Sequence, residues 1–348
     1  MVFCSCRLPL RPASDFTVRL KTNLAADAAL VLTTLIWGST FVIAKDILSH
    51  WPPLAYITVR FGLAALILIA VFPKQLITAG RTEWRAGTVL GVLMGGGFAI
   101  QAVGQVYTTP AKSAFMTSLT TPLVPFVALV LLRVRPNLAN LIGVILASLG
   151  GILILAPRGA FVANQGDLLT LVATFFFASH ITFLSSYARR IDARQLTVLQ
   201  ISVAAAVFVI ASLIVRGAGF LVSANSLPAV MKVESGWPAW SATVAWQLIY
   251  LALVATVITF LLWTWGQARM SATHAAIIFS LEPIFATAFA VAWWGAGQWL
   301  GGWSTVGAAA IIAGVVVSEL RLGRKPPIPD SKSANLEADA DDSDISLD

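Results

Sequence analysis

The chain has 348 residues, of which 58% are hydrophobic and only 11% are charged, and its mean hydropathy is +0.83. A soluble domain is typically about 25% charged, so this composition excludes an ordinary soluble fold and indicates a protein whose solvent is lipid. A net charge of +7 and a pI near 9.8 would suit a nucleic-acid-binding protein. The basic residues lie instead in short loops between apolar runs, which is typical of membrane topology, and we expect no nucleic-acid partner.

The two ends of the chain are polar. Residues 1–26 contain basic side chains but not the apolar core of a cleaved signal peptide, so we interpret them as a cytoplasmic N-terminal tail. Cys4 and Cys6 are the only cysteines and lack a second Cys or His pair, so we expect no disulfide framework, no metal and no other cofactor. Residues 321–348 become rich in Asp and Glu and are interpreted as an acidic, disordered cytoplasmic tail.

Between the tails, the chain is a series of apolar runs. A membrane-spanning helix needs about 20 apolar residues, and runs of about this length predict ten spans. In chain order these spans are 27–48, 53–72, 85–107, 109–132, 137–157, 167–188, 194–215, 243–267, 271–294 and 299–320. Most Lys and Arg residues lie in the tails and in the loops after even-numbered spans, which places both termini in the cytoplasm and the spans in the cell inner membrane.

The chain also repeats itself. Each half contains five predicted spans, and because five is odd, the second half enters the membrane from the opposite face. We therefore predict an all-α polytopic membrane protein with ten transmembrane helices as two inverted five-helix repeats, at 27–157 and 166–320. The matched pairs are Asp27 with Asp167 and Arg60 with Gln200, Ala111 with Ala272 and Pro122 with Pro283, and Gly143 with Gly307 and Gly150 with Gly314.

Glu282 lies eleven residues into the ninth predicted span. An ionised group at the bilayer centre costs roughly 2.5–3.5 kcal/mol on insertion scales, so Glu282 is expected to face the bundle or a cavity. Counting helical rise places Glu282 and Arg60, in the second span, at similar depth. Two interpretations stay open: a structural Arg60–Glu282 ion pair, or a cavity in which Glu282 binds a cationic group or a coupling proton.

Further polar and aromatic side chains lie near the predicted midplane. Trp37 could stack on an aromatic or cationic solute or could simply pack in the core. The other candidates for the cavity wall are Thr34, Thr40, His180 and Gln101; for His180 an interhelical hydrogen bond is the alternative. Pro122 and Pro283 are expected to kink the fourth and ninth spans, either as gating hinges or as static packing kinks.

Several segments carry a resemblance to a known family. They are WGSTFVIAK (37–45), VRF (59–61), TTPAKSAFMTSLTTPLVP (108–125), its counterpart SATHAAIIFSLEPIF (271–285), GD (166–167), and LIGVILASLGGILIL (141–155) with TVGAAAIIAGVVVSE (305–319). Over roughly residues 27–320 the chain resembles EamA-type members of the drug/metabolite transporter superfamily. That family often has Gly-Glu after the fourth and ninth helices. This chain has Arg133–Pro136 and Gly297–Gln298 at those places, so the loop contact made by Gly-Glu is not expected here.

The resemblance implies a ten-helix carrier of small organic solutes. We expect a secondary transporter, not an enzyme, that moves a metabolite or drug, in the direction of efflux, by alternating access around a midplane cavity. Uptake of an amino acid or related metabolite is the nearest alternative, and a membrane-embedded enzyme or sensor is the alternative of another class. The expected partners are the small-molecule solute and the lipid bilayer, and the protein is expected to be a monomer or homodimer.

Overall fold

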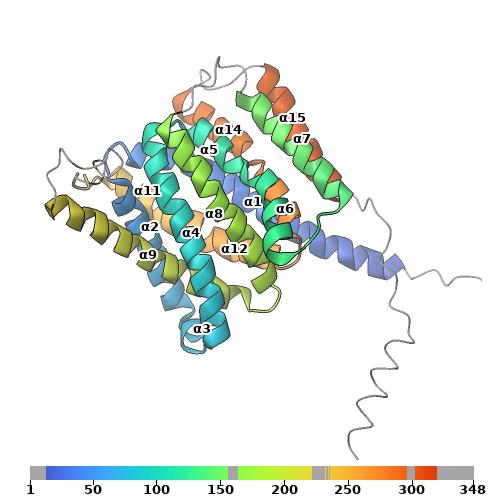
Figure 1. The fold of residues 1–348 in the computed structure, drawn as a ribbon, viewed down its shortest axis with the longest axis horizontal. Coiled ribbons are helices and arrows are strands. Elements are labelled where there is room, and N and C mark those ends of the chain that lie inside the picture. The colour runs from blue at the N-terminus through green and yellow to red at the C-terminus, as the bar shows by residue number, and fades with distance from the viewer. Residues whose placement is uncertain are drawn as a thin grey trace, which may run out of the picture.

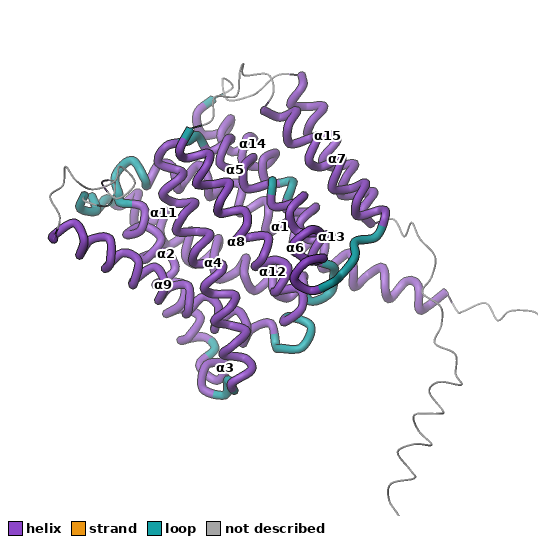
Figure 2. The backbone as a smooth tube through the Cα atoms, viewed as in Figure 1, coloured by secondary structure: helices purple, strands orange, loops and turns teal. Residues whose placement is uncertain are grey.

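The structure, a computed structural model, describes residues 13–155, 164–221, 232, 234, 236–295 and 302–319. Within these residues all regular secondary structure is helical, and short turns join the helices (Figure 2). The helices are α1 (Ala13–Ile47), α2 (Pro53–Val71), α3 (Pro73–Ile77), α4 (Arg81–Tyr107), α5 (Pro110–Ser118), α6 (Thr120–Leu132), α7 (Leu138–Leu155), α8 (Gln165–Tyr187), α9 (Ala193–Leu221), α11 (Ala242–Ala252), the π-helix η3 (Leu253–Ile258), α12 (Thr259–Gln267), α13 (Ala272–Phe279), α14 (Glu282–Trp294) and α15 (Gly302–Glu319).

The predicted all-α membrane fold is confirmed. Among the described residues, eight helical segments are long and apolar enough to cross a membrane, and two shorter apolar helices lie within α7 and α15. The helix α1 begins at Ala13, earlier than the predicted span, because residues 13–26 contain neither Pro nor Gly to stop it. Its apolar part begins at Leu24. Cys4, Cys6 and the acidic residues of 321–348 lie outside the described residues.

The two halves of the chain interlock rather than lying side by side as separate bundles. Helix α4 of the first half packs on α8 and α9 of the second half (Figure 1). In the reciprocal arrangement, η3 and α12 of the second half pack on α1 and α2 of the first. This exchange of equivalent contacts is what two inverted repeats produce, and it brings both halves to the centre of the molecule.

Helices α7 and α15 lie together along one edge of the bundle (Figure 1). A Cβ atom placed on Gly143 would lie 2.8 Å from the carbonyl oxygen of Gly314, and one on Gly150 would lie 2.5 Å from that of Gly307. Real Cβ atoms do not approach so closely, so the glycines permit the two backbones to touch. The glycines that the repeat matches therefore meet across this seam in crossed order, Gly143 against Gly314 and Gly150 against Gly307.

The fourth and ninth predicted spans are each broken into two helices. The first breaks at Leu119, between α5 and α6, and the second between Phe279 and Glu282, where α13 ends and α14 begins. In both, a proline stands in the first turn of the second helix: Pro122 in α6 and Pro283 in α14. Proline has no N–H to donate to the preceding turn, but it suits the start of a helix. In each of the two spans, one helix therefore ends and another begins near the proline.

Candidate functional site

A cavity lies at the meeting point of the two halves. Its wall is formed by residues of both halves, and the broken fourth and ninth spans each contribute residues at their breaks. The lining residues are Trp37, Thr40, Phe41, Arg60, Phe98, Gln101, Thr117, Ser118, Thr120 and Thr121 from the first half, and Phe177, Ile181, Trp263, Phe279 and Glu282 from the second. The wall is thus mainly aromatic and hydroxylic, with one acidic and one basic side chain.

The structure brings most of the predicted site residues together. Glu282, Trp37, Arg60, Gln101 and Thr40 all line this cavity. Their joint placement follows from similar depth in neighbouring helices, which could be counted from the sequence.

Thr34 and His180 are buried but do not line the cavity. The Thr34 hydroxyl donates a hydrogen bond to the carbonyl oxygen of Leu30, one turn earlier in α1, at 2.7 Å. The His180 Nε2 lies 2.9 Å from Oε1 of Gln200, and its ring lies 4.8 Å from that of Trp263. His180 therefore stands behind a cavity aromatic, in the interhelical hydrogen bond that the sequence left open as its alternative role.

Glu282 is the first residue of α14 and is only 6% exposed. No hydrogen bond or ion pair to its carboxyl group occurs among the described residues. A buried carboxylate without a partner is unusual because desolvation disfavours the charge. Such a group is suited to binding a cation or a proton that enters the cavity.

Arg60 does not form the ion pair with Glu282 that one interpretation of the sequence required. Its guanidinium donates from Nε to the Thr256 hydroxyl at 3.0 Å, from Nη1 to the Tyr56 hydroxyl at 3.2 Å and from Nη2 to the Ala255 carbonyl oxygen at 3.1 Å. A guanidinium has five N–H donors, so these bonds fix the group while donors are left for an anionic ligand.

Two of the three acceptors that hold Arg60, the Thr256 hydroxyl and the Ala255 carbonyl oxygen, come from the π-helix η3. Its wider turn changes the backbone hydrogen-bond register, and π-helical turns often occur at functional sites. The Ala255 carbonyl oxygen accepts a second hydrogen bond, from Nε1 of Trp37, at 3.2 Å. The sequence did not reveal this turn, since residues 253–258 read as an ordinary apolar helix.

Trp37 lies in an aromatic cluster as well as at the cavity surface. Its ring centroid is 5.0 Å from that of Trp263, 5.5 Å from that of Phe279 and 5.6 Å from that of Phe260. The Trp37 indole also donates to the Thr259 hydroxyl at 3.1 Å. Because the ring is held on several sides, it presents a fixed apolar face to the cavity.

Gln101 lies opposite the break in the fourth span. Its Nε2 donates to the Thr117 hydroxyl at 2.7 Å, and Thr117 in turn donates to the carbonyl oxygen of Ser113. The side-chain carbonyl oxygen of Gln101 can accept a hydrogen bond from a ligand.

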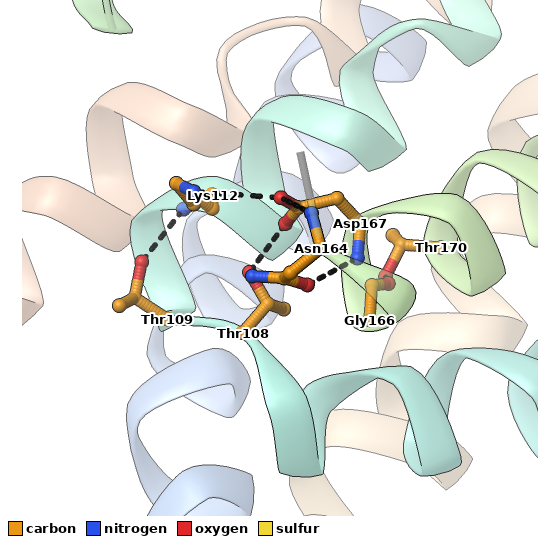
Figure 3. A network of polar contacts seen from close by, with 7 residues as sticks. All are labelled: Thr108, Thr109, Lys112, Asn164, Gly166, Asp167 and Thr170. Atoms are coloured by element: carbon orange, nitrogen blue, oxygen red, sulfur yellow. Dashed lines mark hydrogen bonds and ion pairs between the residues drawn. The ribbon is translucent and has the colours of Figure 1, made fainter. Parts of the chain in front are cut away.

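A polar network lies beyond the cavity, where α4 ends and α8 begins (Figure 3). The carboxylate of Asp167 accepts a hydrogen bond from the Thr108 hydroxyl at 2.6 Å. It also forms an ion pair with Lys112, at 3.4 Å. Asp167 also forms a reciprocal capping box with Asn164 at the start of α8. Nearby, Lys45 donates to the carbonyl oxygens of Gln105, Val106 and Thr108 at the end of α4.

The matching aspartate, Asp27, lies in α1, near the start of its apolar part at Leu24. Its Oδ1 is 3.0 Å from Nε2 of His274, whose Nδ1 is 2.8 Å from the Ser318 hydroxyl. Asp27 and Lys45 are separated by about 27 Å along α1 at 1.5 Å per residue. Each end of the bundle therefore has one aspartate joined to the first turn of a broken span. In the sequence the two aspartates are matched positions of the repeat, but nothing there indicates their partners.

Comparison with known proteins agrees with this architecture. The model of the EamA-like transporter family matches residues 24–156 and 164–320. An uncharacterized transporter of Archaeoglobus fulgidus is 30% identical over 270 residues, covering 78% of each chain. A probable amino-acid metabolite efflux pump of Salmonella typhimurium is 26% identical over 305 residues, covering 83% of this chain and 92% of that protein.

A solved protein structure shares the fold, with a TM-score of 0.63 at 19% sequence identity, covering 84% of this chain and 96% of the other. The family match covers most of the chain in two segments, one for each half, and several helices could cross a membrane. The chain therefore belongs to the EamA-like transporter family and is a multi-pass membrane protein.

Proposed function

We propose that the protein is a secondary transporter that moves a small organic solute through the cavity by alternating access. The observation that carries this proposal is the joint presence of Glu282 and Arg60 in one cavity whose wall belongs to both halves. A carrier needs such a site, because relative movement of the two halves then exposes it to one side of the membrane at a time.

The proposed substrate is an amino-acid-like metabolite, and the proposed direction is efflux. An ammonium group would approach the Glu282 carboxylate, a carboxylate would approach the Arg60 guanidinium, and the aromatic wall would receive an apolar side chain. Probable amino-acid metabolite efflux pumps of Salmonella typhimurium and Escherichia coli are both 26% identical to this chain, which supports this direction over uptake.

The two aspartate contacts would serve as alternating closures. Asp167 with Lys112 joins α8 to α5, and Asp27 with His274 joins α1 to α13. Opening one end requires one contact to separate while the other persists. Pro122 and Pro283 stand where α6 and α14 begin, so bending at these breaks would move half of a span without disturbing the rest.

The proposed location is the cell inner membrane with both termini in the cytoplasm, as the distribution of Lys and Arg indicates. Cys4 and Cys6 are the only thiols of the chain, so they report the position of the N-terminus directly. A membrane-impermeant maleimide should label the protein in permeabilised cells and not in intact ones. Labelling of intact cells to the same extent would reverse the orientation.

Flux tests the function itself. Protein reconstituted into liposomes should release preloaded amino acids faster than protein-free liposomes, with selectivity among a panel of amphoteric, cationic and anionic solutes. Catalytic conversion of a solute without movement across the bilayer would favour a membrane-embedded enzyme. The family and the names of its relatives indicate a transporter rather than an enzyme.

A further inference from the structure

A second cleft lies apart from the cavity, at the turns that follow α6, α8 and α12. Three arginines line it: Arg135 from the turn after α6, and Arg189 and Arg190 from the turn after α8. None of its lining residues is acidic. The cleft therefore concentrates positive charge contributed by both halves of the protein.

Little in the described structure neutralises these arginines. Arg189 donates from Nη2 to the Met270 carbonyl oxygen at 3.1 Å, whereas the guanidinium groups of Arg135 and Arg190 have no hydrogen bond or ion pair among the described residues. The nearby Asp192 accepts instead from the backbone N–H groups of Arg194 and Gln195. Two guanidinium groups are consequently available for an anion, and guanidinium matches phosphate geometry well.

The floor of the cleft offers further donors. Thr273, in the first turn of α13, lines the cleft and is 5% exposed, and its hydroxyl has no hydrogen-bond partner among the described residues. Helix α13 begins at Ala272, so the positive end of its dipole also borders the cleft. An unpartnered buried hydroxyl beside free guanidinium groups points to a bound anion with several oxygen atoms.

The rim of the cleft is apolar on the side of α6. Ala128, Leu132 and Val134 line it there, and the adjacent Leu129, Val130 and Leu131 are 42%, 76% and 48% exposed. These side chains belong to a helix that can cross the membrane, so they face acyl chains. A free anion would make no use of this rim, whereas a lipid would occupy rim and arginines together.

We propose that this cleft binds the phosphate group of an anionic membrane phospholipid, with Arg135, Arg190 and the Thr273 hydroxyl as its contacts and an acyl chain along α6. Basic pockets between transmembrane helices are known places for anionic headgroups. Because Arg135 belongs to the first half and Arg190 to the second, the bound phosphate would join the halves at this end of the bundle.

The test compares lipids on the full-length protein. Native mass spectrometry should show phosphatidylglycerol retained in preference to phosphatidylcholine. In the variant Arg135→Gln with Arg190→Gln, phosphatidylglycerol affinity should fall on the order of thirtyfold, since each basic side chain near an anionic headgroup contributes about a factor of five. The matched control, Arg81→Gln with Arg85→Gln, removes two exposed arginines that do not line the cleft and should bind as the unchanged protein does.

Two outcomes would overturn the proposal. Equal phosphatidylglycerol binding by the cleft variant and the control would show that the cleft does not hold the lipid. Full displacement of phosphatidylglycerol by millimolar inorganic phosphate, with no preference for the lipid, would identify a free-anion site instead. The variant leaves Arg189 and its bond to Met270 in place, and a thermal unfolding curve matching that of the unchanged protein establishes that it is folded.

Discussion

The fourth and ninth spans are built alike but differ in chemistry at their breaks. Pro122 and Pro283 are matched positions in the two halves, and the residue before each is Thr121 and Glu282. The Thr121 hydroxyl donates to the Ala276 carbonyl oxygen at 2.8 Å and so ties α6 to α13. Both residues line the cavity, but Glu282 has no such bond among the described residues.

The second spans of the two halves differ in the same way. Arg60 lines the cavity, while its counterpart Gln200 is fully buried and bonds to His180 and to the Thr264 hydroxyl. At both matched positions one half holds a charged residue on the cavity and the other holds a neutral residue in an internal bond. The two halves thus share the same arrangement of helices and breaks. At each of the two matched positions, only one half has a charged residue that could bind a ligand.

The largest expected effect comes from removing the charge that distinguishes the two breaks. Glu282→Gln should lower amino-acid flux in liposomes at least about thirtyfold, because loss of one partner of a buried charged contact costs about 2–5 kcal/mol. The matched control is Thr121→Ser, which keeps its hydroxyl bond and should transport normally. Flux by Glu282→Gln within a factor of two of the unchanged protein would remove Glu282 from the site.

Arg60→Gln makes the second spans alike and should have the next largest effect. The substituted amide retains some hydrogen bonding but loses the charge, so flux of a zwitterionic solute should fall by about tenfold, equivalent to 1.4 kcal/mol. Flux of a cationic analogue without a carboxylate should fall less. An equal loss for both solutes would indicate that Arg60 maintains the bundle rather than binding the carboxylate.

A smaller effect, on stability, is expected from changing Thr121 at the break of the fourth span. Thr121→Val removes the hydroxyl that bonds the Ala276 carbonyl oxygen and should lower the free energy of unfolding by about 1 kcal/mol. Reversible unfolding in detergent measures this change. Thr121 also lines the cavity, but its hydroxyl is engaged in the bond to Ala276, so flux per folded molecule should fall much less than in Glu282→Gln. A loss of flux as large as that of Glu282→Gln would mean that the two breaks are functionally equivalent.

The smallest expected effect is on the pH dependence of stability. It arises in the segment that follows the second span of each half, where the two halves differ. In the first half this is the short helix α3, whereas in the second it includes Glu234, which is 2% exposed and accepts from the backbone N–H of Leu54 at 2.5 Å. Burial raises the pKa of the Glu234 carboxyl above its ordinary value, although the Leu54 hydrogen bond and Arg216 oppose this.

The folded protein therefore holds the Glu234 proton more tightly than the unfolded chain does. Its contribution to stability should be complete below the ordinary pKa, about 4.5, and should decline as the pH rises through the raised pKa. Unfolding curves measured between pH 4 and pH 7 should show this decline. In Glu234→Gln the decline should be absent, and an unchanged pH dependence in that variant would assign it to other groups.

The fold and part of the site could be predicted because they depend on lengths and depths. Apolar runs near 20 residues define the spans, and counting helical rise placed Glu282, Arg60 and Trp37 at one level. Depth does not determine which way a side chain faces, so His180 and Thr34 were grouped with the cavity although neighbouring helices cover them.

Other parts of the site depend on backbone register and on contacts distant in sequence. The π-helical turn at Leu253–Ile258 has no proline or glycine to announce it, and the partners of Asp27 and Asp167 lie on other helices. These features require the packed structure, because side chains from separate spans decide them.

The Ala255 carbonyl oxygen accepts from both Arg60 and Trp37, so a basic group and an aromatic ring of the binding surface share one anchor. A π-helical turn contains one residue more than an α-helical turn, and it can migrate by one position along a helix without unwinding the remainder. Such a step would rotate the intervening residue by roughly 100°. It would break the bonds of the guanidinium and of the indole to Ala255 at the same time, so charge recognition and ring stacking would be weakened or restored together.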